Sequence, residues 1–439
     1  MGKSYRAYLP EQDFLLPPSL REWLPENHLV YFVSDVVDNL NLSALDAVYG
    51  DEQRGQPPYD PRMMTKVLVY GYCVGVFSSR RIERRLAEDV GFRVLAAGNT
   101  PNFRTIADFR KLHLATLAGL FEEVLKIALE AGALKLGRVA LDGTKVQANA
   151  SKHKAMSYGR MQEQERQLQA EVGELLAQAE AADAAEDAHY GVERRGDELP
   201  AELQRRETRL KKIREAQRAL EERARQRAEK AGKSRTEVAH AKPTAKEQYN
   251  FTDPESRLMK GSDGFVQGYN AQAAVEPSLQ LIVGQRVTAA ANDKGQLEPM
   301  VQVIEQQSGQ RPAGILADSG YCSEKNLEYL AATGRSGHPI DAYIATGKQK
   351  HGEYRQRCPR GPLPQHATRA QRMRRKLQTK AGRAVYAARK TTVEPVFGQI
   401  KQARGFRHFL LRGLAKVRGE WALVCLTHNI LKLHRLCYA

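Results

Sequence analysis

Apolar positions at helical spacing dominate the first part of the chain. Pro61 opens an apolar helical segment, and Ser79 precedes a basic amphipathic stretch. Thr100-Pro101 then combines a capping residue with a proline, which is tolerated in the first turn of a helix. The pattern predicts a helical domain over residues 1–130.

The helices around the Gly91 to Gly98 segment fit two structures. As a helix-turn-helix they would present Arg104, Arg110 and Lys111 to a DNA groove. As an ordinary packing domain they would leave the same side chains in solvent. The pattern does not separate these interpretations.

Short apolar runs with strand character follow. The run 138–144 ends in Asp142-Gly143, and the segments 264–275 and 279–287 predict a β-hairpin that turns at Pro277. Further strands are expected at 314–318 and 341–345, with helices at 294–308 and 323–333. This order predicts a mixed α/β sheet with an antiparallel edge.

A segment rich in Glu, Gln, Ala, Arg and Leu interrupts these strands, and its composition predicts long helices. Residues 161–200 hold 11 acids and 3 bases, whereas 201–235 hold 6 acids and 13 bases. Opposite charge on adjacent helices predicts an antiparallel hairpin. The expected facing residues are Leu168, Val172, Leu175 and Leu176 on one arm and Leu203, Leu210, Ile213 and Leu220 on the other. The alternative is a mobile, solvated helix pair.

The charge of the chain narrows the choice of partner. The net charge is +17, and residues 347–390 contain 14 Lys or Arg against one acid, Glu353. Such a run is often only a solvated or disordered face. It has few long apolar residues to enter a bilayer, so it favours DNA phosphates over an anionic membrane surface.

The cellular compartment and the state of the cysteines are inferred from targeting signals, apolar stretches and cysteine spacing. The N-terminal residues show no secretory signal, and no stretch approaches the roughly 18 apolar residues that span a bilayer. The 5 cysteines are scattered singly, without zinc-ligand spacing. We therefore expect a cytoplasmic protein, nucleoid-associated when bound to DNA.

Three acids stand where catalytic chemistry is expected. Asp142 and Asp318 each follow a buried strand, at the sheet edge where sites of α/β proteins form, although either one alone is commonly a turn residue. Glu394 precedes Pro395, which predicts a helix beginning near residues 391–392 and places Glu394 and Lys401 on one face. A hard divalent cation prefers such carboxylate oxygens. Asp253 and Asp293 are explained more simply as a turn former and a helix cap.

These motifs resemble one known family. The order Asp142, hairpin, Asp318, basic linker and Glu394-x6-Lys401, with the phrases LDGTK, ADSGY and VEPVFGQIK, is similar to DDE transposases of bacterial insertion sequences. The resemblance covers nearly the whole chain and implies an RNase-H-like core of the retroviral-integrase-like superfamily. It also implies that Asp142, Asp318 and Glu394 bind two Mg²⁺ ions, with Mn²⁺ as a substitute, for in-line attack on a phosphodiester.

The resemblance extends to a Tyr-Arg-Lys signature beside the glutamate. Tyr386, Arg389 and Lys401 match it, but four residues separate Arg389 from Glu394 where the family pattern has three. Either Arg389 or Lys390 is therefore the candidate for the phosphate contact. The predicted DNA-binding residues are Tyr386, Arg389, Lys390, Lys401, Arg404, Arg372, Arg374, Arg375, Arg104 and Arg110.

These inferences combine into one organisation. The expected units are a helical DNA-end-binding domain 1–130, the first part of the core 131–155, an inserted helical hairpin 156–235, the remaining core 236–346, a basic DNA-binding linker 347–390, and a catalytic and a packing helix over 391–439. The partners would be double-stranded transposon ends and target DNA, bound by a homodimer. Two alternatives stay open: a domesticated DNA-binding protein that no longer cuts, and a plain metal-dependent nuclease.

Overall fold

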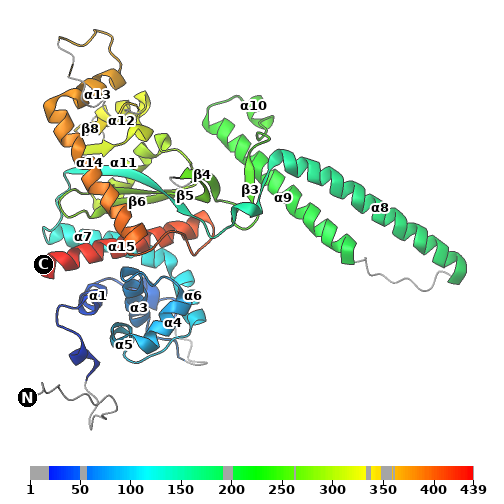
Figure 1. Cartoon of the computed structure of the whole chain (residues 1–439), viewed down its shortest axis with the longest axis horizontal. Helices are drawn as coiled ribbons and strands as arrows, with labels where there is room; N and C mark the ends of the chain where they lie inside the picture. The colour runs from blue at the N-terminus through cyan, green and yellow to red at the C-terminus, as the bar shows by residue number, and fades with distance from the viewer. Residues whose placement is uncertain are drawn as a thin grey trace, which may run out of the picture.

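The computed structural model describes residues 19–49, 57–190, 201–261, 264–332, 338–347, 358 and 361–438, without the side chains of 178–190 and 201–203. The protein combines a mixed α/β body, a group of N-terminal helices against it, and a long helix pair that extends away from it (Figure 1). This confirms the predicted α/β class. Within the described residues, no helix is both long and apolar enough to cross a membrane.

The first part of the chain is helical, as the pattern predicts. Its helices are α1 (Leu29–Asp38), α2 (Ser43–Asp46), α3 (Pro61–Cys73), α4 (Ser79–Glu88), α5 (Val90–Ala96), α6 (Phe103–Leu112) and α7 (Leu114–Glu130), after a 3-10 turn, η1 (Leu20–Trp23). Two details differ from the prediction. The segment after Gly91 is itself a helix, α5, and not a turn between two helices. The cap of α6 is Asn102, whose side chain accepts hydrogen bonds from the backbone of Arg104 and Thr105, and not Thr100.

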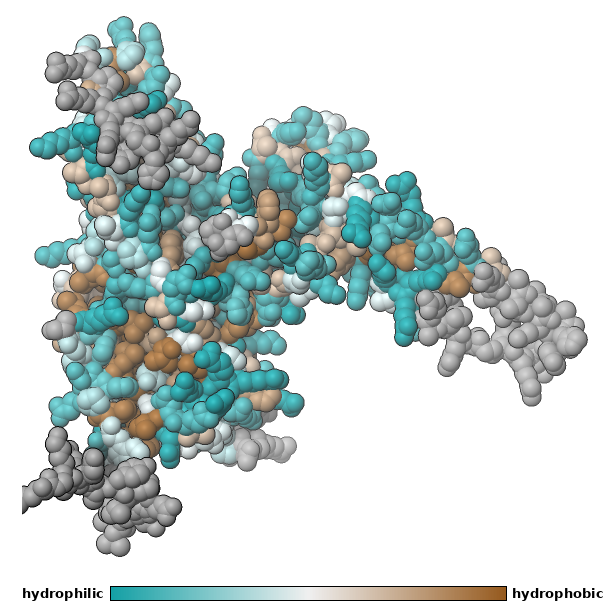
Figure 2. All heavy atoms as spheres, viewed as in Figure 1, coloured by the Kyte–Doolittle hydropathy of each residue, from teal (hydrophilic) through white to brown (hydrophobic). Residues whose placement is uncertain are grey.

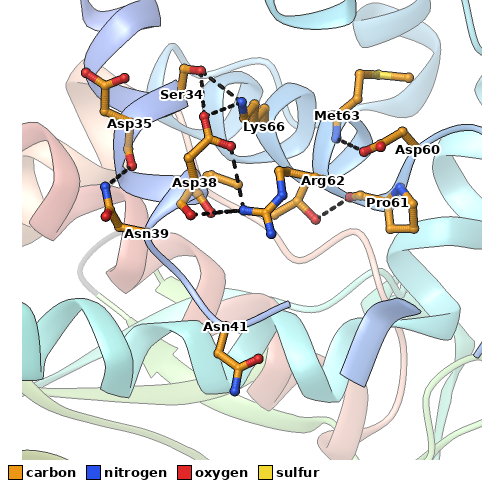
Figure 3. Close-up of polar contacts among 12 residues, drawn as sticks. Ser34, Asp35, Asp38, Asn39, Asn41, Asp60, Pro61, Arg62, Met63 and Lys66 are labelled. Atoms are coloured by element: carbon orange, nitrogen blue, oxygen red, sulfur yellow. Dashed lines mark hydrogen bonds and ion pairs between the residues drawn. The ribbon is translucent and has the colours of Figure 1, made fainter. Parts of the chain in front are cut away.

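The start of α3 shows why this boundary was predictable. Pro61 occupies the first turn, and the Asp60 carboxylate accepts a hydrogen bond of 2.8 Å from the Met63 backbone (Figure 3). On the neighbouring helix α1, Asp38 pairs with Lys66 of α3 at 2.6 Å. Local capping therefore sets where the helix begins, and an ion pair joins it to α1.

The central sheet is built around β1. Its strands are β1 (Arg138–Gln147), β4 (Arg257–Gly261), β5 (Gly264–Val275), β6 (Ile282–Thr288), β7 (Gly314–Ala317) and β8 (Asp341–Ile344), in the order β4-β5-β1-β7-β8 with β6 also paired to β5. Strand β1 is antiparallel to β5 and parallel to β7, and β7 is parallel to β8. Strands β5 and β6 form the predicted hairpin. The predicted mixed sheet with an antiparallel edge is confirmed.

Strand β1 is longer than its apolar run. It continues through Gln147, so Asp142 lies inside the strand and not at its carboxyl end, which corrects the prediction. The parallel pairing with β7 nevertheless stops at Leu141, opposite Ala317. Asp142 therefore stands at the carboxyl end of the parallel part of the sheet, while pairing with β5 carries the strand onward.

Helices cover this sheet. They are α11 (Leu297–Ser308), α12 (Glu324–Ala331), α13 (Arg369–Gln378), α14 (Lys380–Gly398) and α15 (Leu414–Tyr438), with a π-helical turn, η6 (Gln399–Ala403), after α14. Helix α15 contacts α7, α3 and β6. Its Trp421 is fully buried and donates a hydrogen bond of 3.2 Å to the carbonyl of Gln272. The expected core role of this last helix is confirmed.

The helix pair leaves the body through a small sheet. It consists of α8 (Tyr158–Tyr190) and α9 (Ala201–Lys230), followed by α10 (Arg235–Ala239), and its base carries β2 (Ala155–Ser157) paired with β3 (Gln248–Asn250). Leu168 packs with Leu210, Ile213 and Leu220, which confirms the packed hairpin over these positions. The outer surface of the pair is largely hydrophilic (Figure 2), and Leu176 is 39% exposed instead of facing the other arm. The Leu203 side chain and the Gly191 to Pro200 connection lie outside the described residues.

The basic segment is not a linker where the structure describes it. Helix α13 buries Met373 and Leu377 and contacts β8, and α14 begins at Lys380. The helix that carries Glu394 therefore starts more than a turn before the predicted residues 391–392, which corrects that prediction. Pro395 lies inside α14 and leaves the Thr391 carbonyl without its helical N–H partner. Gln280 supplies a hydrogen bond of 3.0 Å to that carbonyl instead.

Candidate active site

Three predicted acids come from different elements of the body. Asp142 lies on β1, and Asp318 directly follows β7, where its carboxylate accepts a hydrogen bond of 2.9 Å from the Gly320 backbone. Glu394 lies on α14, which contacts β1, β5, β7 and β8. The parallel pairing of β1 with β7 brings the two aspartates to one edge, and α14 brings the glutamate across it.

Arg389 connects two of the three acids. Its guanidinium lies 3.1 Å from Asp142 Oδ2 and 3.3 Å from Glu394 Oε1. The Arg389 and Asp142 side chains are only 11% and 20% exposed, whereas that of Glu394 is 52% exposed. A residue five positions before Glu394 therefore reaches back over β1 and holds both carboxylates at a single cation.

Burial sets the acidity of Asp142. Desolvation raises the pKa of this carboxyl to about 6, although Arg389 and the Gly143 N–H act in the opposite direction. The charge of Asp318 raises it further, so these two aspartates lie close enough to interact. Asp142 is therefore mostly ionised at neutral pH, although burial makes its ionised form less favourable than it would be in water.

The surroundings of Arg389 favour its charged form. Burial lowers the pKa of this guanidinium, but Asp142, Tyr386 and Glu394 outweigh burial and raise it. Burial raises the pKa of the neighbouring Tyr386 hydroxyl, whereas Arg389 lowers it. The predicted Tyr386 thus lies beside the predicted Arg389 and within the field of Asp318.

Sequence reasoning missed a polar network next to these acids. Asp293 stands at a helix start but makes no capping bond with its side chain. Its Oδ1 accepts hydrogen bonds from Asn270 at 2.6 Å and from Gln272 at 2.7 Å, and Lys145 lies 3.6 Å away. Asp293 therefore occupies the predicted cap position, but its side chain binds this network and does not cap the helix. The sequence did contain a signal for this network, because the amide side chains of Asn270 and Gln272 lie in a largely apolar strand.

Gly143 packs closely against this network. A Cβ at this position would lie 2.2 Å from Gln272 Nε2 and 2.8 Å from Asp293 Oδ1, so a side chain here would displace the ends of these two hydrogen-bonded groups. The glycine after Asp142 therefore serves the contact between β1 and the amides of β5, and not a turn.

The donor set suits a hard cation. Carboxylate oxygens are the ligands that Mg²⁺ prefers, and Asp142 and Glu394 already share one cationic partner. In the described residues, no three His, Cys, Asp or Glu side chains form a group that could hold a metal as arranged, and Arg389 is paired with both Asp142 and Glu394. The residues fit a divalent ion by chemistry, and binding would require Arg389 to move.

The other predicted site residues on or next to α14 differ in their contacts. Lys401 donates a hydrogen bond of 2.8 Å to the carbonyl of Lys145 on β1. Lys390 is exposed, whereas Arg389 is the residue that pairs with Asp142 and Glu394. Of the two candidates for the phosphate contact, Arg389 is therefore the one beside the acids.

Two predicted DNA contacts are corrected by burial. Arg404 is 9% exposed and donates hydrogen bonds to Thr427 and Val424 of α15. Arg110 is 6% exposed and donates to Tyr72 and Phe77. Guanidinium groups that satisfy buried acceptors are structural, so neither reaches a phosphate in this fold.

The remaining basic residues lie nearer to solvent. Arg104, Arg372 and Arg374 are exposed, and Arg375 is half-buried with a hydrogen bond of 2.6 Å to the Gly361 carbonyl. The basic side chains of α13 therefore remain accessible beside a buried apolar face. Their contact with DNA stays a prediction.

Paired acids at a sheet edge beside basic helices are typical of proteins that act on phosphodiesters. Comparison with known families is consistent with this class. Residues 18–112 match the family described as a transposase domain (DUF772), and residues 338–434 match a transposase DDE domain. Together these matches support the assignment of the chain to the DDE-type transposases of insertion sequences.

The two matches cover different parts of the site. The second includes Arg389, Glu394 and Lys401, whereas Asp142 and Asp318 lie outside both. No curated protein and no solved structure matches the chain. A transposase acts on DNA, and the net charge of +17 is consistent with that partner.

Proposed function

We propose that this protein cleaves DNA at the ends of an insertion sequence and transfers the strands by metal-dependent, in-line transesterification. Asp142, Asp318 and Glu394 are the catalytic and metal-binding residues of this proposal. One observation carries it: Arg389 pairs with Glu394 and with Asp142, which lies 247 residues before it in the sequence, and Asp142 and Asp318 interact at the same sheet edge. Two isolated turn aspartates and a surface glutamate would not meet in this way.

The sheet supports an RNase-H-like core. Strand β1 lies between the antiparallel strand β5 and the parallel strand β7, and the proposed acids stand on β1, after β7 and on the helix that crosses them. The organisation into a DNA-end-binding N-terminal domain, a divided core and an inserted helix pair belongs to the same proposal.

The residues divide the work as follows. Asp142, ionised at and above neutral pH, and Asp318 present carboxylates to a cation, and Glu394 adds a third from α14. Bound Mg²⁺ or Mn²⁺ would stabilise the charge on the entering and leaving oxygens of the phosphodiester. Arg389, once its two carboxylates bind a cation, is free to contact the DNA phosphate. No covalent protein nucleophile is needed.

The partners follow from the reaction. Transposon ends and target are DNA duplexes, and exposed Arg104, Arg372 and Arg374 are candidates for their phosphates. Two ends must be held together during transfer, which a homodimer accomplishes. The domesticated DNA-binding protein and the plain nuclease differ from this proposal in their products.

The test uses the purified chain, Mg²⁺ and a labelled duplex that carries one end of its own element. Wild-type protein should yield cleaved and joined strands, whereas Asp142→Asn, Asp318→Asn and Glu394→Gln should each bind the duplex and lose on the order of a thousandfold or more in rate. Binding without any product would favour the non-cutting protein. Cleavage without joined strands would favour the nuclease.

A matched control is available on the same sheet. Asp341 lies at the first residue of β8, the opposite end of the parallel strands from Asp318, and is paired with Lys376. Asp341→Asn should keep full activity. Products that persist in Asp142→Asn would remove that residue from the site.

A further inference from the structure

Basic side chains gather where β1 ends, on the side of the body from which the helix pair leaves. A groove there is lined by residues 147–154, 252, 265–267, 408 and 412. A second groove is lined by residues 153–156, 209, 212, 213 and 251, and it shares His153 and Lys154 with the first. The two grooves therefore form one surface from the sheet to α9.

The charge of this surface has one sign. None of the described residues that line the two grooves is acidic. The basic side chains on it are exposed, and we call them the basic track: Lys152, Lys154, Arg209, Lys212, His408 and Arg412. Elsewhere on the helix pair, Arg206 and Arg214 are paired with Glu171 and Glu165. By contrast, no ion pair is recorded for Arg209 or Lys212 of the track among the described residues.

The backbone under the track is fixed. Phe409 donates a hydrogen bond of 2.8 Å to the carbonyl of Gln147, and Arg412 donates one of 2.9 Å to the carbonyl of Asn149. Asn149 in turn donates one of 2.7 Å to the carbonyl of Leu410. These bonds hold the segment after η6 along the end of β1, so the track has a set position relative to Asp142.

We propose that the basic track binds the phosphate backbone of the duplex beside the cleaved bond, and that the helix pair extends this DNA-binding surface. The proposal rests on the proposed function, because it places the scissile phosphate at Asp142. Gln147 follows Asp142 by five residues, which spans about 17 Å of strand. At a rise of about 3.4 Å per nucleotide, the track meets phosphates about five positions from the cleaved bond.

An aromatic side chain on the rim distinguishes DNA from an acidic peptide. Phe265, 62% exposed, lines the first groove next to the basic side chains. An exposed aromatic ring among cations is suited to a sugar or a base, whereas an acidic peptide would need only the cations. The track is also continuous with the strand that carries Asp142.

The experiment measures binding without cleavage, on the full chain with the labelled end duplex in EDTA across a range of NaCl concentrations. Replacement of Lys152, Lys154 and Arg412 by Gln should lower the salt-dependence slope by about 2 to 3, near 0.9 for each lost phosphate contact. Arg209→Gln with Lys212→Gln should lower it by up to about 2. Phe265→Ala should weaken binding without changing the slope.

A second measurement locates the contact. Duplexes with single neutral methylphosphonates should weaken wild-type binding most near the fifth phosphate from the cleaved bond, and the triple variant should lose this sensitivity. The control replaces three exposed basic residues outside the track, Lys126, Lys325 and Arg435, by Gln and should leave the slope unchanged. Unchanged thermal unfolding of all variants shows that they are folded.

The outcomes separate the two proposals. An unchanged slope in the triple variant, or a sensitivity map that does not change with it, overturns the track and leaves the catalytic proposal intact. A lowered slope in a protein that fails to cut in Mg²⁺ overturns the catalytic proposal and keeps the DNA-binding surface. If the track variants instead lose affinity only for an acidic peptide such as poly-glutamate, the DNA assignment is wrong.

Discussion

The sheet edge and the helix pair are both held by ion pairs, but in different settings. Asp142 and Arg389 are 247 residues apart, with side chains 20% and 11% exposed. Glu165 and Arg214 are 49 residues apart, with side chains 23% and 43% exposed. The first pair joins the core strand to the proposed catalytic helix, and the second joins two neighbouring helices.

Burial decides what each pair contributes. A largely buried charge loses its water, so its partner must compensate, and removal of Arg389 leaves the buried Asp142 carboxylate without its partner. When an ion pair near the surface breaks, water solvates both charges. Such pairs therefore typically contribute less than about 1 kcal/mol to the free energy of unfolding. We therefore expect the Asp142–Arg389 ion pair to affect function at the sheet edge. The Glu165–Arg214 ion pair is expected to affect the local geometry of the helix pair.

The strongest test of this comparison is Arg389→Gln. It leaves Asp142 and Glu394 without their shared cation, so the unfolding free energy in EDTA should fall by about 3 kcal/mol. Chemical denaturation measures this change, and Lys390→Gln is the control because its side chain is exposed. Added Mn²⁺ should restore more stability to Arg389→Gln than to wild type. Equal stability of both variants would show that the buried pair contributes nothing.

A smaller effect is expected from the pH dependence of Asp142. Its pKa is raised from 3.8 to about 6, so the folded state favours the protonated carboxyl, and this contribution is complete below pH 4 and lost as pH rises through 6. Asn imitates the protonated form. In EDTA, Asp142→Asn should therefore exceed wild type by about 2 kcal/mol at pH 8 and match it near pH 4. Parallel stability curves for Asp142→Asn and wild type across this pH range would contradict the burial argument.

Helix α14 allows a test of about 1 kcal/mol. Pro395 leaves the Thr391 carbonyl open, and Gln280 satisfies it. Gln280→Ala should destabilise wild type by about 1 kcal/mol but have less effect beside Pro395→Ala, which restores the backbone N–H. A double-mutant cycle by thermal unfolding gives the coupling. Additive effects would mean that Gln280 acts through Gln399 or Lys432 instead.

The smallest effect is expected on the helix pair. A double-mutant cycle of Arg214→Gln and Glu165→Gln should give a coupling below about 0.5 kcal/mol, and 0.5 M NaCl should reduce it further. Chemical denaturation again measures it, and DNA cleavage should be unchanged. A coupling as large as that of Arg389 with Asp142 would erase the proposed difference between the two regions.

The sequence by itself determined the local elements. Apolar alternation predicted the hairpin of β5 and β6, and charge and apolar spacing predicted the packing of α8 on α9 around Leu168. The strands that lead to Asp142 and Asp318 were visible as short apolar runs. Such features depend on a few neighbouring residues, whose periodicity reports which side is buried.

Only the tertiary structure decided what depends on distant partners. The helix continues through Pro395 because Gln280, 111 residues before Thr391 in the sequence, donates a hydrogen bond to the Thr391 carbonyl that the proline leaves without a partner. Arg404 and Arg110 have structural roles because they donate hydrogen bonds to buried acceptors. The Asp293 carboxylate accepts hydrogen bonds from amides of β5 instead of capping a helix. Arg389 rather than Lys390 meets the acids because the fold turns Arg389 toward Asp142 and leaves Lys390 exposed. Burial and long-range contact set these roles, and neither is encoded in local spacing.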